Sequence, residues 1–380
     1  MGNAVSALID DYAACYYNPA GLALSAENGF TLGYFYAAPR VRTRDALGVE
    51  RLTFQTLTRA GVVGYRQNLR SLFPEKWGKN IVVALALAFP DNFKTATMVR
   101  TRYYHEMQFP VFGRVPDMLV MSAGLGFELH RLLLIGMGMR FSVTYSAKDL
   151  TVYLKVLEGQ NLFQKVDVNA ETEAQPIAGV ILRPLDSLRL AAVWRRGGAP
   201  VSLVGKGGGK AEIGPIELPL SLNLCFQDFF TPDEFAGALS WAPVERLLLG
   251  FELTYARWSK YDDPFGQKPP GDPFFDILIP RFGAEVQVLE GLRAQLGYYW
   301  QPSPVRDAQS ATRYLDTDEH VFSCACEYAL RLDRFLEVPL KLQAYFQVQH
   351  LPRRTLTTVG GTMSVWGTIT NVGGTVQLSF

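Results

Sequence analysis

The amino-acid sequence predicts an all-β protein, a transmembrane antiparallel β-barrel of about fourteen strands with an N-terminal hatch, or plug, in its lumen. Three observations predict this fold. Strands alternate apolar and polar residues, the chain is apolar without a run long enough for a spanning helix, and short turns alternate with long loops. A soluble β-sandwich also alternates, so it is the alternative that composition has to exclude.

The alternation is clearest in the C-terminal third, in the ranges 281–288, 292–301 and 340–349, and the last strand ends at Phe380. Successive side chains of a strand point to opposite faces, so each segment has one apolar and one polar side. We expect these residues to face lipid: Val286, Leu296, Leu342 and Phe346. We expect these residues to face the lumen: Glu285, Gln295, Gln343 and Gln347.

Composition favours the barrel over the sandwich. Hydrophobic residues make up 48% of the chain and charged residues only 19%, below the roughly 25% that is usual for soluble domains. The longest apolar run, Ile81–Pro90, is about half of what a spanning helix needs. A net charge of +1 without a basic block argues against a nucleic-acid partner. The four cysteines are expected to be free thiols, and Cys324 and Cys326 share a lipid-facing side.

Turns and loops set the expected number of strands. Short turns are predicted at 67–79, 129–131, 184–187, 243–245, 289–291 and 332–336. Long polar or Gly/Pro-rich loops are predicted at 40–48, 91–116, 148–170, 205–231, 262–273, 302–318 and 351–366. Six short turns on one side of the membrane, with strands that leave and return on that side, give about fourteen strands. The part near 214–230 holds either an extra strand or an extension beyond the membrane.

Residues 1–28 differ from the rest of the chain because they lack the two-residue period. They read as short helical turns that end at the break Asn18, Pro19, Ala20 and Gly21. An apolar segment that is not part of the wall is most economically placed inside the lumen. We therefore expect two units, a hatch at 1–28 and a barrel at 29–380.

This N-terminal segment resembles the hatch of the FadL family, the outer-membrane transporters of long-chain fatty acids and hydrophobic compounds. Further similar stretches are Gly250 to Tyr261 with its Trp258-Ser259 pair, the arginine-led strand at 281–287, the turn Ser303-Pro304-Val305, the acidic stretch 316–322 and the terminal Phe380. Their order and spacing cover nearly the whole chain. The resemblance implies a Gram-negative outer-membrane location, and facilitated diffusion of a fatty acid or hydrocarbon through a plugged, monomeric barrel. It also implies contact with outer-membrane lipids or lipopolysaccharide, and assembly through Phe380 by the barrel assembly machinery.

Two other functions remain open at this stage. A barrel of this family could serve protein secretion or surface attachment instead of lipid uptake. A barrel hydrolase would need a histidine beside a nucleophile and an acid, and only His320, next to Asp318 and Glu319, comes near to that pattern. The histidines lack metal-ligand spacing, so we expect no metal, no cofactor and no enzyme activity.

The candidate functional residues lie in the hatch and on one wall strand. Asn18, Pro19, Ala20 and Gly21 form a turn that is either part of a gate or purely structural, because proline fixes its own φ and pushes the preceding residue toward extended geometry. Candidate substrate-binding residues, in an apolar pocket expected near residues 18–24, are Tyr16, Leu22, Leu24 and Phe89. Pro90 either kinks the third strand, which in the FadL family opens the wall sideways, or simply ends it.

Glycines and tryptophans complete the sequence patterns. The cluster at 205–210 lacks the spacing of a phosphate loop and reads as a flexible loop tip. Glycine pairs at 124 and 126, and at 136 and 138, put two glycines on one strand face, which predicts a close approach or a bend. The six tryptophans fall near proposed strand ends, as expected for aromatic girdles, with ligand stacking as the alternative for one or two of them. They are Trp77, Trp194, Trp241, Trp258, Trp300 and Trp366.

Overall fold

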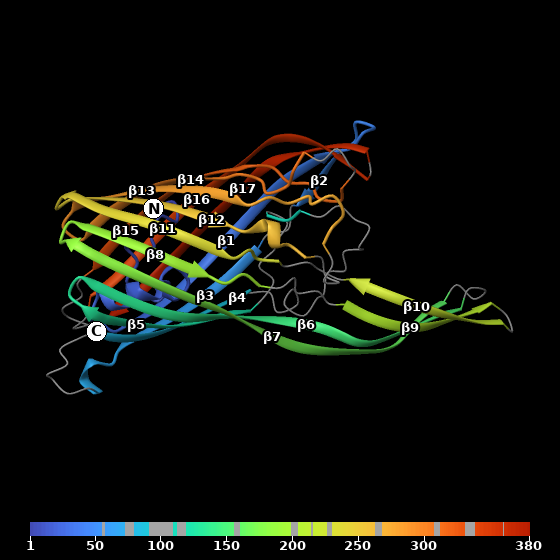
Figure 1. Ribbon diagram of the computed structural model, residues 1–380, viewed down its shortest axis with the longest axis horizontal. Helices are drawn as coiled ribbons and strands as arrows, with labels where there is room; N and C mark the ends of the chain where they lie inside the picture. Colours follow the sequence, from blue (N-terminus) through green and yellow to red (C-terminus); the bar gives the residue numbers. More distant parts are fainter. Residues whose placement is uncertain are drawn as a thin grey trace.

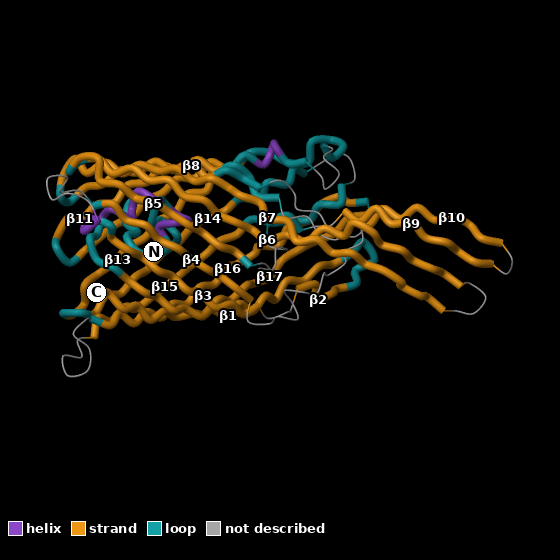
Figure 2. The backbone as a smooth tube through the Cα atoms, turned by 90° about the horizontal axis from the view of Figure 1, so that it is seen from below, coloured by secondary structure: helices purple, strands orange, loops and turns teal. Residues whose placement is uncertain are grey.

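The protein, seen in a computed structural model, is a long barrel of antiparallel strands that surrounds its own N-terminus (Figures 1 and 2). The structure describes residues 1–54, 58–72, 80–90, 109–111, 119–155, 160–198, 204–213, 216–225, 230–262, 268–307, 312–330, 339–359 and 361–380. Within this part, fourteen strands pair with their neighbours in chain order, and β1 pairs with β17 to close the wall. The predicted all-β barrel of about fourteen strands is therefore confirmed.

The bounds of the wall strands are as follows. They are β1 (Gly29–Arg44), β3 (Thr58–Asn68), β4 (Ile81–Pro90), β5 (Val120–His130), β6 (Leu133–Lys155), β7 (Gln160–Leu185) and β8 (Leu188–Arg195), followed by β11 (Glu234–Val244), β12 (Leu247–Ala256), β13 (Ile277–Leu289), β14 (Leu292–Gln301), β15 (Glu319–Leu330), β16 (Leu340–Thr358) and β17 (Gly361–Ser379). Three strands lie outside this cycle, β2 (Glu50–Phe54), β9 (Val204–Ile213) and β10 (Ile216–Cys225). The short helices are α1 (Ala14–Tyr17), η1 (Pro19–Leu24), η2 (Arg70–Leu72) and η4 (Trp258–Lys260). Among the described helices, none has the length and apolar character needed to cross a membrane.

The short turns lie at one end of the barrel. The turns predicted near 129–131, 184–187, 243–245 and 289–291 connect β5 to β6, β7 to β8, β11 to β12 and β13 to β14. The turns predicted at 67–79 and 332–336 fall wholly or partly outside the described residues. Phe380 lies at the same end, where its backbone exchanges two hydrogen bonds with Asn28.

At the opposite end, several predicted loops are strands instead. The ranges 148–170 and 351–366 lie mostly in the ends of β6, β7, β16 and β17, and the glycine cluster at 205–210 belongs to β9 and not to a loop tip. The hairpin of β9 and β10 joins β6 in parallel and, with β6 and β7, extends beyond the barrel (Figure 2). These predictions were wrong because ladder hydrogen bonds stabilise a paired strand without an apolar face. For 214–230, the sequence left open an extra strand or an extension beyond the membrane. The structure has an additional strand there, β10, which belongs to the sheet beyond the barrel.

The two faces of the wall follow the sequence alternation. Val286, Leu296, Leu342 and Phe346 are among the exposed large hydrophobic residues. The opposite face of β13 and β14 meets the N-terminus, because a Cβ added at Gly283 would lie 3.0 Å from the Met1 carbonyl carbon. Gln295 and Glu285 share this inner face and are joined by a hydrogen bond of 2.7 Å. Cys324 and Cys326 are exposed on β15, and Cys15 is a buried free thiol.

Candidate functional site

The N-terminal segment, residues 1–24, is seated against inward-facing glycines of the wall. A Cβ added at Gly126 on β5 would lie 2.7 Å from the Pro19 carbonyl oxygen, and one at Gly136 on β6 would lie 2.7 Å from the Ala20 Cα. On the far wall, one at Gly250 on β12 would lie 2.7 Å from the Ala4 carbonyl oxygen. The close approach predicted for the glycine pairs of β5 and β6 is therefore confirmed, and its partner is the N-terminal segment.

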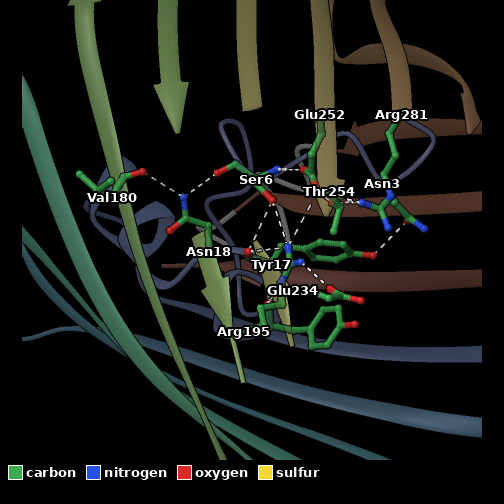
Figure 3. A network of polar contacts seen from close by, with 11 residues as sticks. Asn3, Ser6, Tyr17, Asn18, Val180, Arg195, Glu234, Glu252, Thr254 and Arg281 are labelled. Carbon is green, nitrogen blue, oxygen red and sulfur yellow. Dashed lines mark hydrogen bonds and ion pairs between the residues drawn. The ribbon is translucent and has the colours of Figure 1, made fainter. Parts of the chain in front are cut away.

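Asn18 fixes the turn between α1 and η1. Its backbone is extended, with φ −162° and ψ 103°, and it is completely buried. Its side-chain Oδ1 accepts a hydrogen bond from the Ala20 N–H (3.1 Å), which caps η1. Its Nδ2 donates to the carbonyl oxygens of Ser6 (2.8 Å) and, on wall strand β7, Val180 (3.5 Å) (Figure 3). One amide thus joins two parts of the segment to the wall.

A network of charged side chains holds the same segment from the other side. Arg195, on β8, donates hydrogen bonds to the carbonyl oxygens of Tyr16 (3.1 Å) and Tyr17 (3.0 Å). It also donates to the Ser6 hydroxyl (3.3 Å) and forms an ion pair with Glu234 (2.9 Å). Because this guanidinium is almost completely buried, its hydrogen bonds position the segment strongly.

Glu252 of β12 is the negative centre of this network. It is 1% exposed and pairs with Arg281 at 3.2 Å and with Arg195 at 3.9 Å. Its Oε2 accepts a hydrogen bond from the Ser6 N–H (3.2 Å). Figure 3 shows these side chains converging on the segment from strands β8, β12 and β13. A buried carboxylate needs such partners, because an unpaired charge in the lumen would be costly.

A cavity of about 350 Å³ lies beside this network, and Arg195, Glu234 and Arg281 are part of its lining. The N-terminal segment contributes Asn3 and Tyr16 to its lining. The rest consists of arginines, of the polar or acidic residues Gln175, Thr231, Glu234 and Gln301, and of apolar and aromatic side chains. The arginines are Arg140, Arg195, Arg196 and Arg281, and the apolar and aromatic group includes Val111, Ile177, Ala256, Trp258, Ile279 and Tyr299.

Tyr16 and Tyr299, the two tyrosines of the lining, each have an arginine guanidinium over the ring. The guanidinium groups of Arg140 and Arg195 lie 5.8 and 5.5 Å from the Tyr16 ring centre, and Arg281 lies 5.7 Å from that of Tyr299. The Arg140 Nε is buried without a hydrogen-bond partner among the described residues. The cavity therefore combines aromatic surface with donors that the protein itself does not fully use.

The outer side of the cavity opens onto an aromatic cluster. This outer aromatic cluster consists of Phe230, Trp258, Tyr261, Phe274 and Tyr314, with ring centres 4.5 to 5.9 Å apart. Trp258 is only 3% exposed. Its assignment to a lipid-facing girdle was wrong, because η4 turns the ring inward after β12 ends. Trp194, Trp241 and Trp300 are exposed at strand ends, and Trp77 lies outside the described residues.

Comparison with known proteins supports this architecture. No family model matches the chain. Alkane uptake protein A of Marinobacter nauticus is 24% identical over 372 residues, which cover 92% of this chain and 80% of that protein. A solved structure of a Pseudomonas aeruginosa FadL homologue covers 98% of this chain and 94% of its own, with a TM-score of 0.57 and 15% identity. This chain has the FadL fold.

A second solved structure agrees with this identification. The Pseudomonas putida toluene transporter TodX covers 97% of this chain and 94% of its own, with a TM-score of 0.59 and 14% identity. The resemblance to the FadL family found in the sequence is thereby confirmed at the level of the fold. In the FadL fold of this chain, the N-terminal segment and the charged network both contribute residues to the lining of the cavity.

The structure separates the predicted substrate-binding residues. Tyr16 lines the cavity. Leu22 is completely buried and would meet Cβ atoms added at the inward glycines of β5, while Leu24 packs against the apolar cluster around Ala20. Phe89 lies on the outer face, over Gly61 of β3, and so does not line the cavity.

The expected apolar pocket near residues 18–24 is thus corrected. Residues 19–23 are buried against the glycine wall, and the cavity lies beside Tyr16 with an arginine-rich lining. Pro90 is the last residue of β4, whose ladders carry no register shift. A wall kink there stays a prediction, because residues 91–108 lie outside the described part.

Sequence reasoning missed the charged residues of the network. Glu252 stands directly opposite Arg281 in the ladder of β12 and β13, and Glu234 stands opposite Arg195 in that of β11 and β8. In the sequence, each of these residues is an isolated charge at a position that faces the lumen, and it cannot be distinguished there from any other polar residue of a barrel interior. The signal that identifies them is strand register, because cross-strand neighbours of opposite charge interact directly.

His320 lies on the outer face of β15. Its Nδ1 is hydrogen-bonded to the Tyr298 hydroxyl (2.9 Å). Asp318 accepts hydrogen bonds from the Trp300 indole N–H (3.2 Å) and the Ser303 N–H (2.9 Å). These contacts commit both groups to structural partners and do not form the nucleophile, base and acid arrangement that a hydrolase needs.

Proposed function

We propose that this barrel carries hydrophobic molecules passively across the outer membrane of a Gram-negative cell. The observation that carries the proposal is the cavity, which joins the outer aromatic cluster to the N-terminal segment inside a wall of the FadL fold. Trp258, Ile279 and Tyr299 give this cavity an apolar side, against which a hydrophobic molecule can bind, beside the arginines that line the rest. The matched proteins are named for the uptake of alkanes and the transport of toluene, and we propose the same class of substrate here.

The proposed route runs from the outer aromatic cluster through the cavity to the N-terminal segment. The cluster and the cavity share Trp258, and Ile279 and Tyr299 of the cavity belong to the same hydrophobic core as the cluster, so a molecule that separates the aromatic rings reaches the cavity directly. No energy source is part of this proposal, and a concentration gradient would drive the transfer. Release would be sideways through the wall or inward past the segment.

In this proposal residues 1–28 form a hatch and residues 29–380 form the barrel. The turn at Asn18, Pro19, Ala20 and Gly21 would be part of the gate. Its support is the single Asn18 amide that joins η1, Ser6 and wall strand β7. Loosening one residue would therefore release several contacts together.

The lining also supports a finer proposal about the substrate. Within the described part of the chain, the Nε atoms of Arg140 and Arg281 have no hydrogen-bond partner, but Arg281 also forms an ion pair with Glu252, and Arg195 forms one with Glu234. A hydrophobic molecule with an anionic end, such as a long-chain fatty acid, would supply an acceptor for the Arg140 donor. We therefore propose that the cavity accepts fatty acids as well as hydrocarbons.

Uptake by cells that carry the barrel tests the function. Ile279→Trp adds bulk inside the cavity, and it should lower the uptake of hexadecane, toluene and oleate. Leu278→Trp is the matched control on the outward face of the same strand, where Leu278 is 52% exposed and tryptophan is tolerated at the lipid boundary. Surface amounts of folded barrel have to be equal for the two variants.

Uptake equal to that of barrel-free cells, for all three compounds with the unmutated chain, would contradict transport. The protein-handling alternative would then lead. It is favoured by one observation, the sheet of β6, β7, β9 and β10 that extends beyond the barrel (Figure 2) and offers strand edges to a partner. We also propose a monomeric barrel whose terminal Phe380, 55% exposed, is presented to the assembly machinery.

A further inference from the structure

Arginines gather on the outward face of the barrel, at the end away from the short turns. We call Arg40, Arg42, Arg44, Arg59 and Arg353 the arginine belt. The first three are alternate residues of β1, and the others lie on β3 and β16, so the belt crosses the neighbouring strands β16, β17, β1 and β3. All five side chains are exposed.

Aromatic rings place the belt relative to the membrane. The Arg353 guanidinium lies 4.6 Å from the ring centre of Trp366 on β17, and Arg42 stands opposite Trp366 in the ladder. Arg59 lies 6.0 Å from the ring centre of Tyr36. Closer to the barrel middle, the same face carries the exposed apolar residues Leu32, Tyr34, Phe346 and Val372. Tryptophan and tyrosine mark the lipid–water boundary, so the belt lies at the level of the outer-leaflet headgroups.

The belt carries little compensating negative charge. Arg44 pairs with Glu50 at 3.7 Å, and Asp45 accepts hydrogen bonds from the backbone N–H groups of its own turn. Within the described part of the chain, no ion pair reaches Arg40, Arg42 or Arg353. Hydroxyl groups lie beside them, since Arg353 contacts the Ser364 Oγ at 3.5 Å.

The rim of β12 to β15 is different in charge. There, the Tyr255 hydroxyl donates to Asp276, and the Trp300 indole N–H donates to Asp318. Aromatic groups of the boundary are thus paired with carboxylates on one side of the barrel and stacked with arginines on the other. In the described part of the rim, β12 to β15 therefore differ in charge from the belt.

We propose that the arginine belt binds the phosphorylated headgroup of an outer-leaflet glycolipid. Arginine binds phosphate through two parallel hydrogen bonds. Arg42 on β1 and Arg353 on β16 flank Trp366 on β17, so they lie two interstrand spacings, or about 10 Å, apart. Arg40 lies about 7 Å from Arg42 along β1. Donors spread over this distance match a large headgroup with more than one phosphate better than the single phosphate of a phospholipid. The inference rests on the proposed outer-membrane location and not on transport.

Native mass spectrometry of the purified barrel, with EDTA present to remove bridging cations, tests the inference. The probes are bis-phosphorylated lipid A, monophosphorylated lipid A, phosphatidylglycerol and phosphatidylcholine. The test variant combines Arg40→Gln, Arg42→Gln and Arg353→Gln. The matched control combines Arg70→Gln, Arg131→Gln and Arg246→Gln, which removes the same charge from exposed positions at the short-turn end.

The test variant should bind bis-phosphorylated lipid A at least tenfold more weakly than the unmutated barrel, and the control should change less than twofold. The same three arginines changed to lysine should give an intermediate loss, because lysine keeps the charge but not the two-fold hydrogen bonding. Heat-dependent migration in gels shows that each barrel is folded.

Three results would overturn the inference: unchanged binding by the test variant, an equal loss in the control, or phosphatidylglycerol bound as tightly as bis-phosphorylated lipid A. Hydrocarbon uptake is measured separately on the same variants. Normal uptake by an unmutated barrel that does not bind lipid A refutes this inference alone and leaves the transport function standing.

Discussion

Replacing Gly126 by alanine should loosen the N-terminal segment without disturbing the wall. The added Cβ would lie 2.7 Å from the Pro19 carbonyl oxygen, 2.7 Å from the Leu22 Cβ and 2.9 Å from the Ala23 nitrogen. All three atoms belong to the segment. Ordinary contact begins at 3.4 Å, so the segment must retreat by about 0.7 Å.

The wall cannot retreat in its place. Gly126 lies in the ladders of β5 with both β4 and β6, whereas the segment is held by side-chain hydrogen bonds and packing and not by a strand ladder. Overpacking of this kind costs about 1–3 kcal/mol. Since 1.4 kcal/mol is a factor of ten, the undocked fraction of the segment should rise about five- to 150-fold.

Hydrogen exchange of residues 12–24, measured on the purified barrel, reports this undocking. Gly237→Ala on β11 is the control, because nothing lies within 4 Å of its added Cβ. The Gly126→Ala variant should exchange faster in the segment and equally in the wall strands. Equal exchange of the segment in the two variants would refute the reasoning that the glycines exist to seat it.

Three further predictions concern charged groups. Arg195→Gln should destabilise docking of the segment by about 3 kcal/mol, the lower end of the range for breaking a buried ion pair, because Glu252 keeps its second partner Arg281. The control Arg293→Gln, at a side chain that is 53% exposed, should cost under about 1 kcal/mol. Equal hydrogen exchange of the segment in both variants would count against the network. Arg140→Gln should weaken oleate uptake at limiting concentration by about tenfold or more, which corresponds to the energy of one hydrogen bond to a charged group. Hexadecane uptake should stay unchanged. An equal loss of uptake for both compounds would refute the proposal that the cavity binds an anionic end. Burial, with a smaller contribution from Asp10, raises the pKa of Asp11 to about 6. The folded state therefore holds this proton more tightly than the unfolded chain, so docking of the segment should weaken as pH rises from about 4 to 6 and level off above that. Asp11→Asn should remove this pH dependence in protease-protection assays. A pH dependence that survives in this variant would assign it to another group.

The alternation of side chains was enough to predict the wall. In β13 and β14, the residues expected to face lipid are exposed, and those of the other face meet the N-terminus. A period of two is imposed by strand geometry itself, so this information is local. The inner glycines could also be predicted as sites of close approach, although the sequence did not indicate what approaches.

The site could be predicted only in part, because it depends on contacts between distant residues. Glu252 and Arg281 become partners only through strand register, and Arg195 meets Tyr16 across 179 positions. Phe89 was chosen for its chemistry, but its parity along β4 puts it on the outer face. Trp258 shows the opposite error, since a helical turn after a strand breaks the parity that identifies lipid-facing rings.

The seating of the N-terminus has a consequence for the order of assembly. The Gly2 N–H donates a hydrogen bond to the Ser323 hydroxyl, 321 positions later (3.1 Å), and Met1 lies against Gly283. Met1 and Gly2 thus complete their contacts only when β13 and β15, strands far along the chain, are in place. Contacts of such long separation form late, because the chain between them must be ordered first. Docking of the N-terminus should therefore mark the end of folding, after or together with the pairing of β1 and β17, and a barrel that closes around an undocked terminus would be a kinetic trap.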